Sequence, residues 1–174
     1  HAYHRTLAGY APTPLIELPE VARRLGVRHV VAKDESRRFE LPAFKGLGAS
    51  WAIYRTVRER AAQTPSTIVT ATDGNHGRAV ARFARELGHR ARIFLPDGVH
   101  PAAVQAIADE GAEVVRIADN YDAAVRAAAA YAQETDGALL VQDTSWPGYE
   151  DVPQWIVDGY STLFHEIDDQ LEAR

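Results

Sequence analysis

Five short runs of branched and apolar residues alternate along the chain with segments of helical length and periodicity. This alternation is typical of a parallel sheet covered on both faces, because parallel neighbours need a crossover connection that is usually a helix. Helix ends agree, since Gly88 and Gly111 follow apolar helical stripes and Pro101 suits a first helical position. We therefore expect an α/β fold, a three-layer αβα arrangement with a mostly parallel sheet. The strand-like runs are residues 29–32, 67–72, 91–95, 113–117 and 138–141.

The composition is that of an ordinary globular protein. The chain has 174 residues, of which 46% are hydrophobic and 25% charged. Its longest apolar run, residues 127–131, is far shorter than the roughly 20 residues of a membrane helix, so we expect no membrane partner and a cytoplasmic location. The absence of cysteine excludes disulfides and thiolate metal sites. The seven histidines show no ligand spacing, so we predict no metal site.

Charge is distributed unevenly between the two halves of the chain. Residues 1–90 carry 15 basic and 8 acidic side chains, whereas residues 91–174 carry 4 and 16. Helix faces that neutralise each other across the fold would explain this pattern, and so would a basic half that binds an anionic ligand. The arginines are dispersed without interleaved aromatic residues, which argues against nucleic acid as a partner.

The stretch TATDGNHG, residues 70–77, lies where a strand run gives way to a helical pattern. A strand that turns through glycine onto a helix start presents unpaired backbone N–H groups and the positive end of the helix dipole. Such a turn binds small anions, and in an α/β sheet it lies at the ligand-binding edge. Asp73, Asn75 and His76 add side-chain chemistry there, although we interpret His76 mainly as a residue that orients the loop.

Only two of the 19 basic residues are lysines, Lys33 and Lys45. An imine with a carbonyl cofactor requires a lysine amine, so amine chemistry would have to use one of these two. Lys33 ends a strand-like run, whereas Lys45 begins a helix after Phe44, a more protected position. Partial burial at a positive helix end would lower the pKa of a lysine. A plain surface lysine remains the alternative.

These motifs resemble those of the pyridoxal-phosphate enzymes of fold type II, which include the serine and threonine dehydratases and tryptophan synthase β. AFKGLG around Lys45 and TDGNHG from Thr72 carry the resemblance. KDESRRF, NYDAAVR and VQDTSWPGYEDVPQWIVDGY make the chain more similar to the diaminopropionate ammonia-lyases, over nearly its whole length. The resemblance implies a cofactor, pyridoxal 5'-phosphate, and a small amino acid as substrate.

The resemblance also implies a role for each matching residue. Lys45 would bind the cofactor covalently, and Phe44 would lie against the cofactor ring. Asn75 would form a hydrogen bond with the phenolic oxygen of the cofactor. The backbone amides and the hydroxyl around Thr72, Asp73 and Gly74 would receive the substrate carboxylate. The ammonia-lyase family uses two bases, so Lys45 and Asp73 would each take the Cα proton of one enantiomer of 2,3-diaminopropionate. Tyr121 and Asp143 match further active-site positions, and Asp143 could keep the leaving amine protonated or merely cap a turn.

The chain departs from the family in two respects. It has no glycine-rich loop for the cofactor phosphate, so we expect these residues alone to be weakly active or inactive, as an N-terminal portion of a two-domain enzyme. Residues 46–150 would then be the smaller mobile domain, and residues 1–45 and 151–174 would lead to or belong to the larger one, in a homodimer. Glu40 also stands where a small residue is expected.

Three functions remain open at this point. The first is elimination of ammonia from diaminopropionate, with pyruvate as the other product. The second is the related dehydration of serine or threonine. The third is a fold type II remnant without catalysis that acts as a binding or assembly module.

Overall fold

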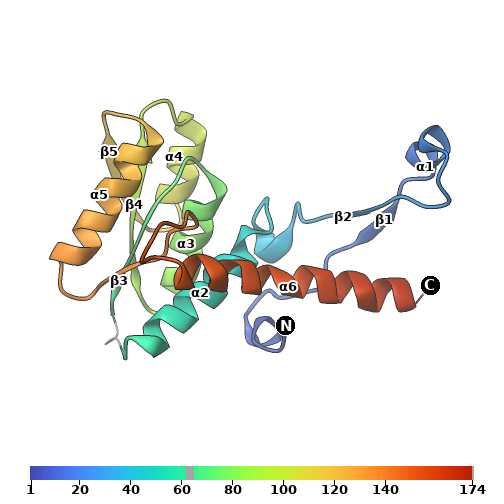
Figure 1. Ribbon diagram of the computed structural model, residues 1–174, viewed down its shortest axis with the longest axis horizontal. Helices are drawn as coiled ribbons and strands as arrows, with labels where there is room; N and C mark the ends of the chain where they lie inside the picture. Colours follow the sequence, from blue (N-terminus) through green and yellow to red (C-terminus); the bar gives the residue numbers. More distant parts are fainter. Residues whose placement is uncertain (62–64, 174) are drawn as a thin grey trace.

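The computed structural model describes residues 1–61 and 65–173, and its main body is a four-stranded parallel sheet with the order β5-β4-β3-β6 (Figure 1). The expected strands are confirmed with shifts of one or two residues at their ends. The strands are β3 (Thr67–Ala71), β4 (Arg90–Pro96), β5 (Glu113–Ile117) and β6 (Ala138–Leu140). The helices that follow or precede them are α2 (Lys45–Glu59), α3 (Asn75–Glu86), α4 (Pro101–Ala108), α5 (Tyr121–Glu134) and α6 (Asp151–Glu172).

Helices cover both faces of this sheet, as the alternating pattern predicts. Helix α5 packs on β3, β4 and β6 through its small residues, among which Ala124 and Ala128 are fully buried. On the other face α3 packs against β3 and β4, α4 packs against β5, and α2 packs on α3. The three-layer arrangement is therefore confirmed. None of the described helices combines the length and apolar character that crossing a bilayer requires.

The run expected at residues 29–32 is a strand, but it lies outside the main sheet. The observed strand β2 (Val31–Lys33) pairs antiparallel with β1 (Leu15–Glu17) in a separate two-stranded sheet. Only the short helix α1 (Pro19–Leu25) connects them, which suffices for antiparallel neighbours. Together these elements form an arm that extends from the sheet on the same side as the distal part of α6 (Figure 1).

Helices α2 and α6 cross at two glycines. A Cβ atom on Gly159 would lie 2.6 Å from the carbonyl oxygen of Leu47 and 2.8 Å from the Cα of Gly48. A Cβ on Gly48 would lie 2.6 Å from the Tyr160 ring and 2.8 Å from the carbonyl oxygen of Ile156. The two helices approach this closely only because neither position carries a side chain.

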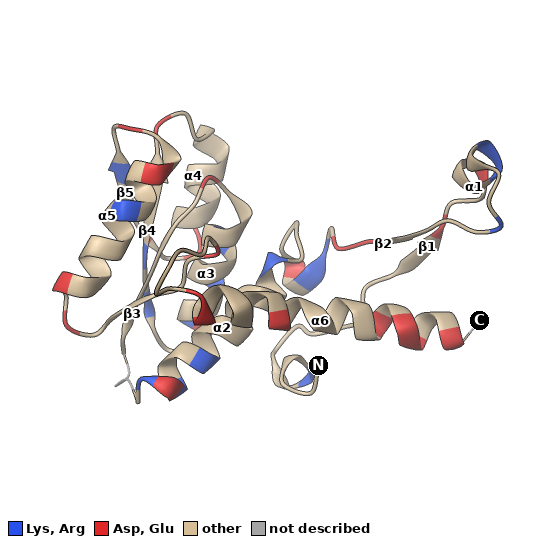
Figure 2. Cartoon of the chain, in the orientation of Figure 1, with Lys and Arg blue, Asp and Glu red and all other residues tan. Residues whose placement is uncertain are grey.

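Buried ion pairs connect the basic first half of the chain to the acidic second half. The carboxylate of Glu110 forms ion pairs with three arginines of α3. The distance to Arg82 is 2.6 Å, and the other two are Arg78 and Arg85. Glu166 of α6 binds Arg38 and Lys33 at 2.7 and 2.8 Å. The acidic residues along α6 are visible in Figure 2. Mutual neutralisation within the fold therefore accounts for part of the uneven charge.

The backbone before α2 is strained at the position where a small residue was expected. Phe39 and Glu40 have φ values of 53° and 60°, in the left-handed region that costs most residues about 1–2 kcal/mol. Arg38, the residue before them, is fully buried and binds Glu35 as well as Glu166. These ion pairs hold the loop in place and so sustain its conformation.

Replacing Gly159 with alanine should destabilise the protein by about 1–3 kcal/mol, because the new Cβ meets backbone atoms that cannot rotate away. An alanine in an open helical position would instead stabilise by about 1 kcal/mol. Urea denaturation measures the difference. Asp158→Ala, at an exposed position on the same helix, should stay within about 0.5 kcal/mol of the native protein. A more stable Gly159→Ala protein would contradict the described crossing.

Low pH should weaken the ion pair by which Glu166 of α6 holds Arg38 in the loop before α2. Burial alone would raise the pKa of Glu166, but hydrogen bonds from Arg38 and Lys33 outweigh burial and lower it to about 2. A carboxylate with a lowered pKa stabilises the fold above pH 4.5, and this stability is lost as the pH falls toward 2. Glu166→Gln should remove this dependence and cost about 3–5 kcal/mol at neutral pH, since Arg38 loses its buried partner.

Unfolding free energies measured at pH 2.5 to 7 test this expectation. Asp169→Asn, on the same helix but exposed, is the matched control and should keep the native pH dependence. An unchanged stability of the Glu166→Gln protein at pH 7 would contradict the expectation.

Candidate active site

The turn between β3 and α3 is organised by the hydroxyl of Thr72. This oxygen accepts hydrogen bonds from the backbone N–H groups of Gly74 at 3.0 Å and Gly77 at 3.2 Å. Gly77 has no room for a side chain, because a Cβ would lie 2.2 Å from Thr72 Cγ2. Two N–H groups of the expected anion cradle are thus already bound to Thr72. The hydroxyl proton of Thr72 and the N–H groups of Asn75 and His76, the first two of α3, stay available for a ligand.

Asp73 and Asn75 lie exposed at this turn. The Asp73 carboxylate has no hydrogen-bond or ion-pair partner in the part of the chain that the structure describes, yet its charge contributes to raising the pKa of Tyr121 after the larger effect of burial. A Cβ on Gly74 would meet no atom within 4 Å, so the space beside the turn is open. The turn therefore presents an unpaired carboxylate beside open space.

His76 is a buried residue that fixes the turn to the neighbouring strand end. Its Nε2 donates a hydrogen bond to the carbonyl oxygen of Val141 at 2.9 Å. Burial lowers the pKa of His76, so the ring is neutral and Nδ1, 3.8 Å from Asp143, is a bare acceptor without a partner among the described residues. This arrangement is consistent with the interpretation of His76 as an orienting residue.

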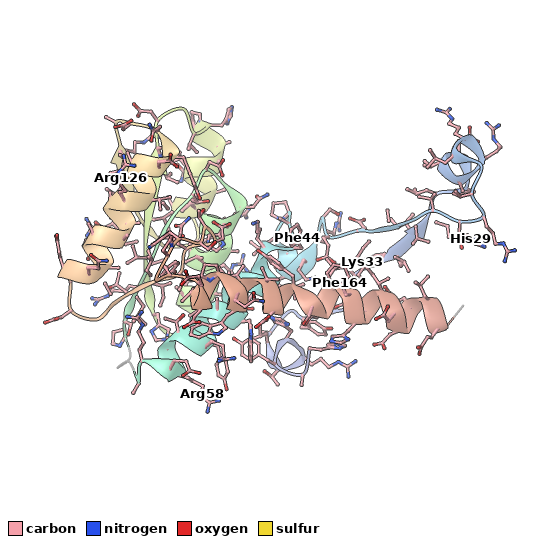
Figure 3. All side chains as sticks on the ribbon, in the orientation of Figure 1. His29, Lys33, Phe44, Arg58, Arg126 and Phe164 are labelled. Carbon is pink, nitrogen blue, oxygen red and sulfur yellow. The ribbon has the colours of Figure 1, made fainter. Side chains whose placement is uncertain are left out.

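The two lysines have different environments. Lys33, the last residue of β2, has an almost completely buried side chain that binds Glu166 and Gln170 of α6 and the carbonyl oxygen of Thr13 (Figure 3). Lys45, the first residue of α2, is 30% exposed, and its Nζ lies 3.1 Å from Asp143 Oδ2. The expected lowering of the Lys45 pKa is wrong: burial alone would lower this pKa, but Tyr160 and Asp143 outweigh burial and raise it. Lys45 is thus the lysine that a ligand can reach.

Two aromatic rings flank the Lys45 amine. Nζ lies 5.9 Å from the centre of the Phe44 ring and 5.8 Å from that of Tyr160. The two rings meet edge to face at 4.9 Å. Phe44 is partly exposed, so its ring can still contact a bound group. Tyr160 did not emerge from the sequence because it lies in α6, more than a hundred residues from Lys45.

Gln142 connects the predicted residues at the sheet edge. Its side-chain oxygen accepts hydrogen bonds from Thr70 Oγ1 and the Ala71 N–H, at 2.9 and 2.8 Å. Its side-chain nitrogen donates to Tyr121 Oη at 2.9 Å and to Asp143 Oδ1 at 3.3 Å. The other oxygen of Asp143 therefore faces Lys45. Gln142 directly precedes Asp143, but a buried glutamine carries no signal in the sequence.

The structure brings most of the predicted residues to the carboxyl ends of β3 and β6. Lys45, Asp143 and Tyr121 are joined by contacts, and Thr72, Asp73, Gly74 and Asn75 form the adjacent turn. Asp143 contacts side chains of Lys45 and Gln142, which distinguishes it from a plain turn cap. Among the described residues, no group of three or more His, Asp or Glu side chains is arranged to hold a metal ion. The site therefore offers an amine, two carboxylates and a glycine turn at the start of a helix.

The chain is similar over nearly its whole length to known diaminopropionate ammonia-lyases. The chain is 41% identical to the diaminopropionate ammonia-lyase of Escherichia coli (strain K12) over 97% of its own length, and 43% identical to that of Salmonella typhimurium (strain LT2) over 98%. The structure matches that of the holo enzyme from Escherichia coli with a TM-score of 0.92 at 40% identity, over 98% of this chain and 48% of that one.

The chain spans about half the length of the curated relatives it matches, 46% in each case. The family model described as "Pyridoxal-phosphate dependent enzyme" matches residues 6–174, which is almost all of this sequence. This chain belongs to the family of pyridoxal-phosphate dependent enzymes.

Proposed function

We propose that a protein containing this chain binds pyridoxal 5'-phosphate through Lys45 and eliminates ammonia from 2,3-diaminopropionate, releasing pyruvate. The observation that carries the proposal is the Lys45–Asp143 contact at the sheet edge where the turn with Asp73 also lies. The named relatives support the choice of reaction. We further propose a homodimer in the cytoplasm, on the family resemblance alone.

The residues present fit the cofactor. Lys45 has a reachable amine, and the partly exposed ring of Phe44 beside it can lie against a planar ring. The space beside Gly74 is open, and Asn75 at the start of α3 is exposed toward solvent. The sequence contains no glycine-rich loop for the phosphate, so that group would be held by residues outside this chain. When bound, pyridoxal phosphate supplies a ring that accepts the electron pair left by removal of a Cα proton.

The chain's own residues bind the substrate and move its protons. The hydroxyl proton of Thr72 and the N–H groups of Asn75 and His76 would hold the substrate carboxylate, helped by the positive helix end. Lys45, once neutral, would take the Cα proton from one enantiomer. Asp73, a carboxylate without a described partner, would take it from the other. Two bases explain how one site could use both mirror-image substrates.

Asp143 would assist departure of the β-amino group. An amine leaves poorly unless it is protonated, and a nearby carboxylate favours the ammonium form. Asp143 already holds one ammonium, that of Lys45, at 3.1 Å. When Lys45 is engaged with the cofactor, Oδ2 of Asp143 becomes free to pair with the ammonium of the substrate. This preference for a cation distinguishes diaminopropionate from the β-hydroxy substrates serine and threonine.

Asp73→Asn in the full-length protein should abolish pyruvate release from one enantiomer of diaminopropionate and spare the other. Loss of a proton acceptor costs about 10²–10⁴-fold in rate, and Lys45 remains to serve the second enantiomer. A coupled pyruvate assay with each pure enantiomer measures the effect.

Asp97→Asn is the matched control, because Asp97 is an exposed carboxylate that follows the neighbouring strand β4. It should leave both rates unchanged. Equal retention, or equal loss, of both activities in the Asp73→Asn protein would contradict the two-base assignment.

A further inference from the structure

The hydroxyl of Tyr160 is buried without a partner in the described part of the protein. Its oxygen is shielded from solvent, and no described group forms a hydrogen bond with it. A buried polar group without a partner costs about 1–3 kcal/mol, so it calls for a physical reason. Burial raises the pKa of Tyr160, so the phenol keeps its proton at physiological pH.

The crossing of α2 and α6 determines where this hydroxyl lies. Gly159 lets α6 approach the backbone of Leu47, and Gly48 leaves space for the Tyr160 ring. The ring packs edge to face on Phe44, and its centre lies 5.8 Å from Lys45 Nζ. Tyr160 therefore stands beside the Lys45–Asp143 pair, from a helix at the far end of the chain.

The reactive form of Lys45 is the neutral amine, which has two hydrogens and one lone pair. Asp143 Oδ2 accepts one N–H, and the Tyr160 hydroxyl is a second described oxygen near Nζ, since its interaction with Lys45 contributes to raising the pKa of the lysine. When Asp143 holds one N–H, the second hydrogen and the lone pair can exchange between the two remaining positions on the nitrogen, so the lone pair has no single direction. A second acceptor would direct the lone pair away from both oxygens.

We propose that Tyr160 is a positioning residue whose hydroxyl accepts the second N–H of Lys45 and so aims the lysine lone pair at the cofactor or the substrate. This inference rests on the proposed function of Lys45. It gives a role to a buried hydroxyl that forms no hydrogen bond with the described residues.

Tyr160→Phe keeps the ring and removes only the oxygen. In the cofactor-free full-length protein, the variant should have an unchanged or higher melting temperature, because a buried unpaired group is lost. Capture of pyridoxal phosphate, followed by absorbance, should be about five- to tenfold slower, the effect of one hydrogen bond. A lower melting temperature would show that the hydroxyl is structural, and an unchanged capture rate would show that it does not orient Lys45. Either result overturns the inference.

Tyr10→Phe is the matched control, since the Tyr10 hydroxyl donates to Glu166 at 2.9 Å, away from Lys45. It should lower the melting temperature and leave the capture rate unchanged. Lys45→Ala separates the two proposals. If the native protein shows no capture that depends on Lys45, the proposed function fails, whereas equal capture by the native and Tyr160→Phe proteins refutes only the role of Tyr160.

Discussion

Helices α2 and α6 touch backbone to backbone at Gly48 and Gly159, and the environment of Lys45 depends on this contact. The close approach places the Tyr160 ring against Phe44, so that the Lys45 amine at the start of α2 lies between two aromatic rings. Further along α6, Glu166 binds Arg38 and Lys33 and ties the strained loop before α2 to the same helix. One helix thus both shapes the lysine site and anchors the segment that leads into it.

The parallel sheet supplies the other side of the site. Strands β3 and β6 are neighbours, so the turn that follows β3 and the segment that follows β6 meet at one edge. Gln142 joins them, because its amide binds the backbone of Ala71 at one end and Tyr121 and Asp143 at the other. The carboxylate that pairs with Lys45 is therefore oriented by the sheet itself. The hydrogen bonds of Gln142 thus connect the backbone of the sheet to the side chains of the candidate active site.

Local patterns predicted the helices and strands of the main sheet, since hydrophobic periodicity and glycine stops act over short distances. The same patterns indicated the turn at Thr72 and singled out Lys45, because a chain with two lysines leaves few choices. They could not predict contacts between distant segments. Four features depend on three-dimensional packing in this way. They are the pairing of β2 with β1, the contact of α2 and α6 at two glycines, the hydrogen bonds of Gln142 and the unpaired hydroxyl of Tyr160. Motif resemblance supplied candidate roles, and the structure supplied their geometry.

The central claim is that Lys45, rather than Lys33, is the residue that binds pyridoxal phosphate. The most direct measurement is to incubate the protein with pyridoxal phosphate, reduce it with borohydride and map the adduct by mass spectrometry. We predict a single stable label on Lys45 and none on Lys33, whose amine is enclosed by Glu166, Thr13 and Gln170. Equal labelling of both lysines, or no label on Lys45, would contradict the account.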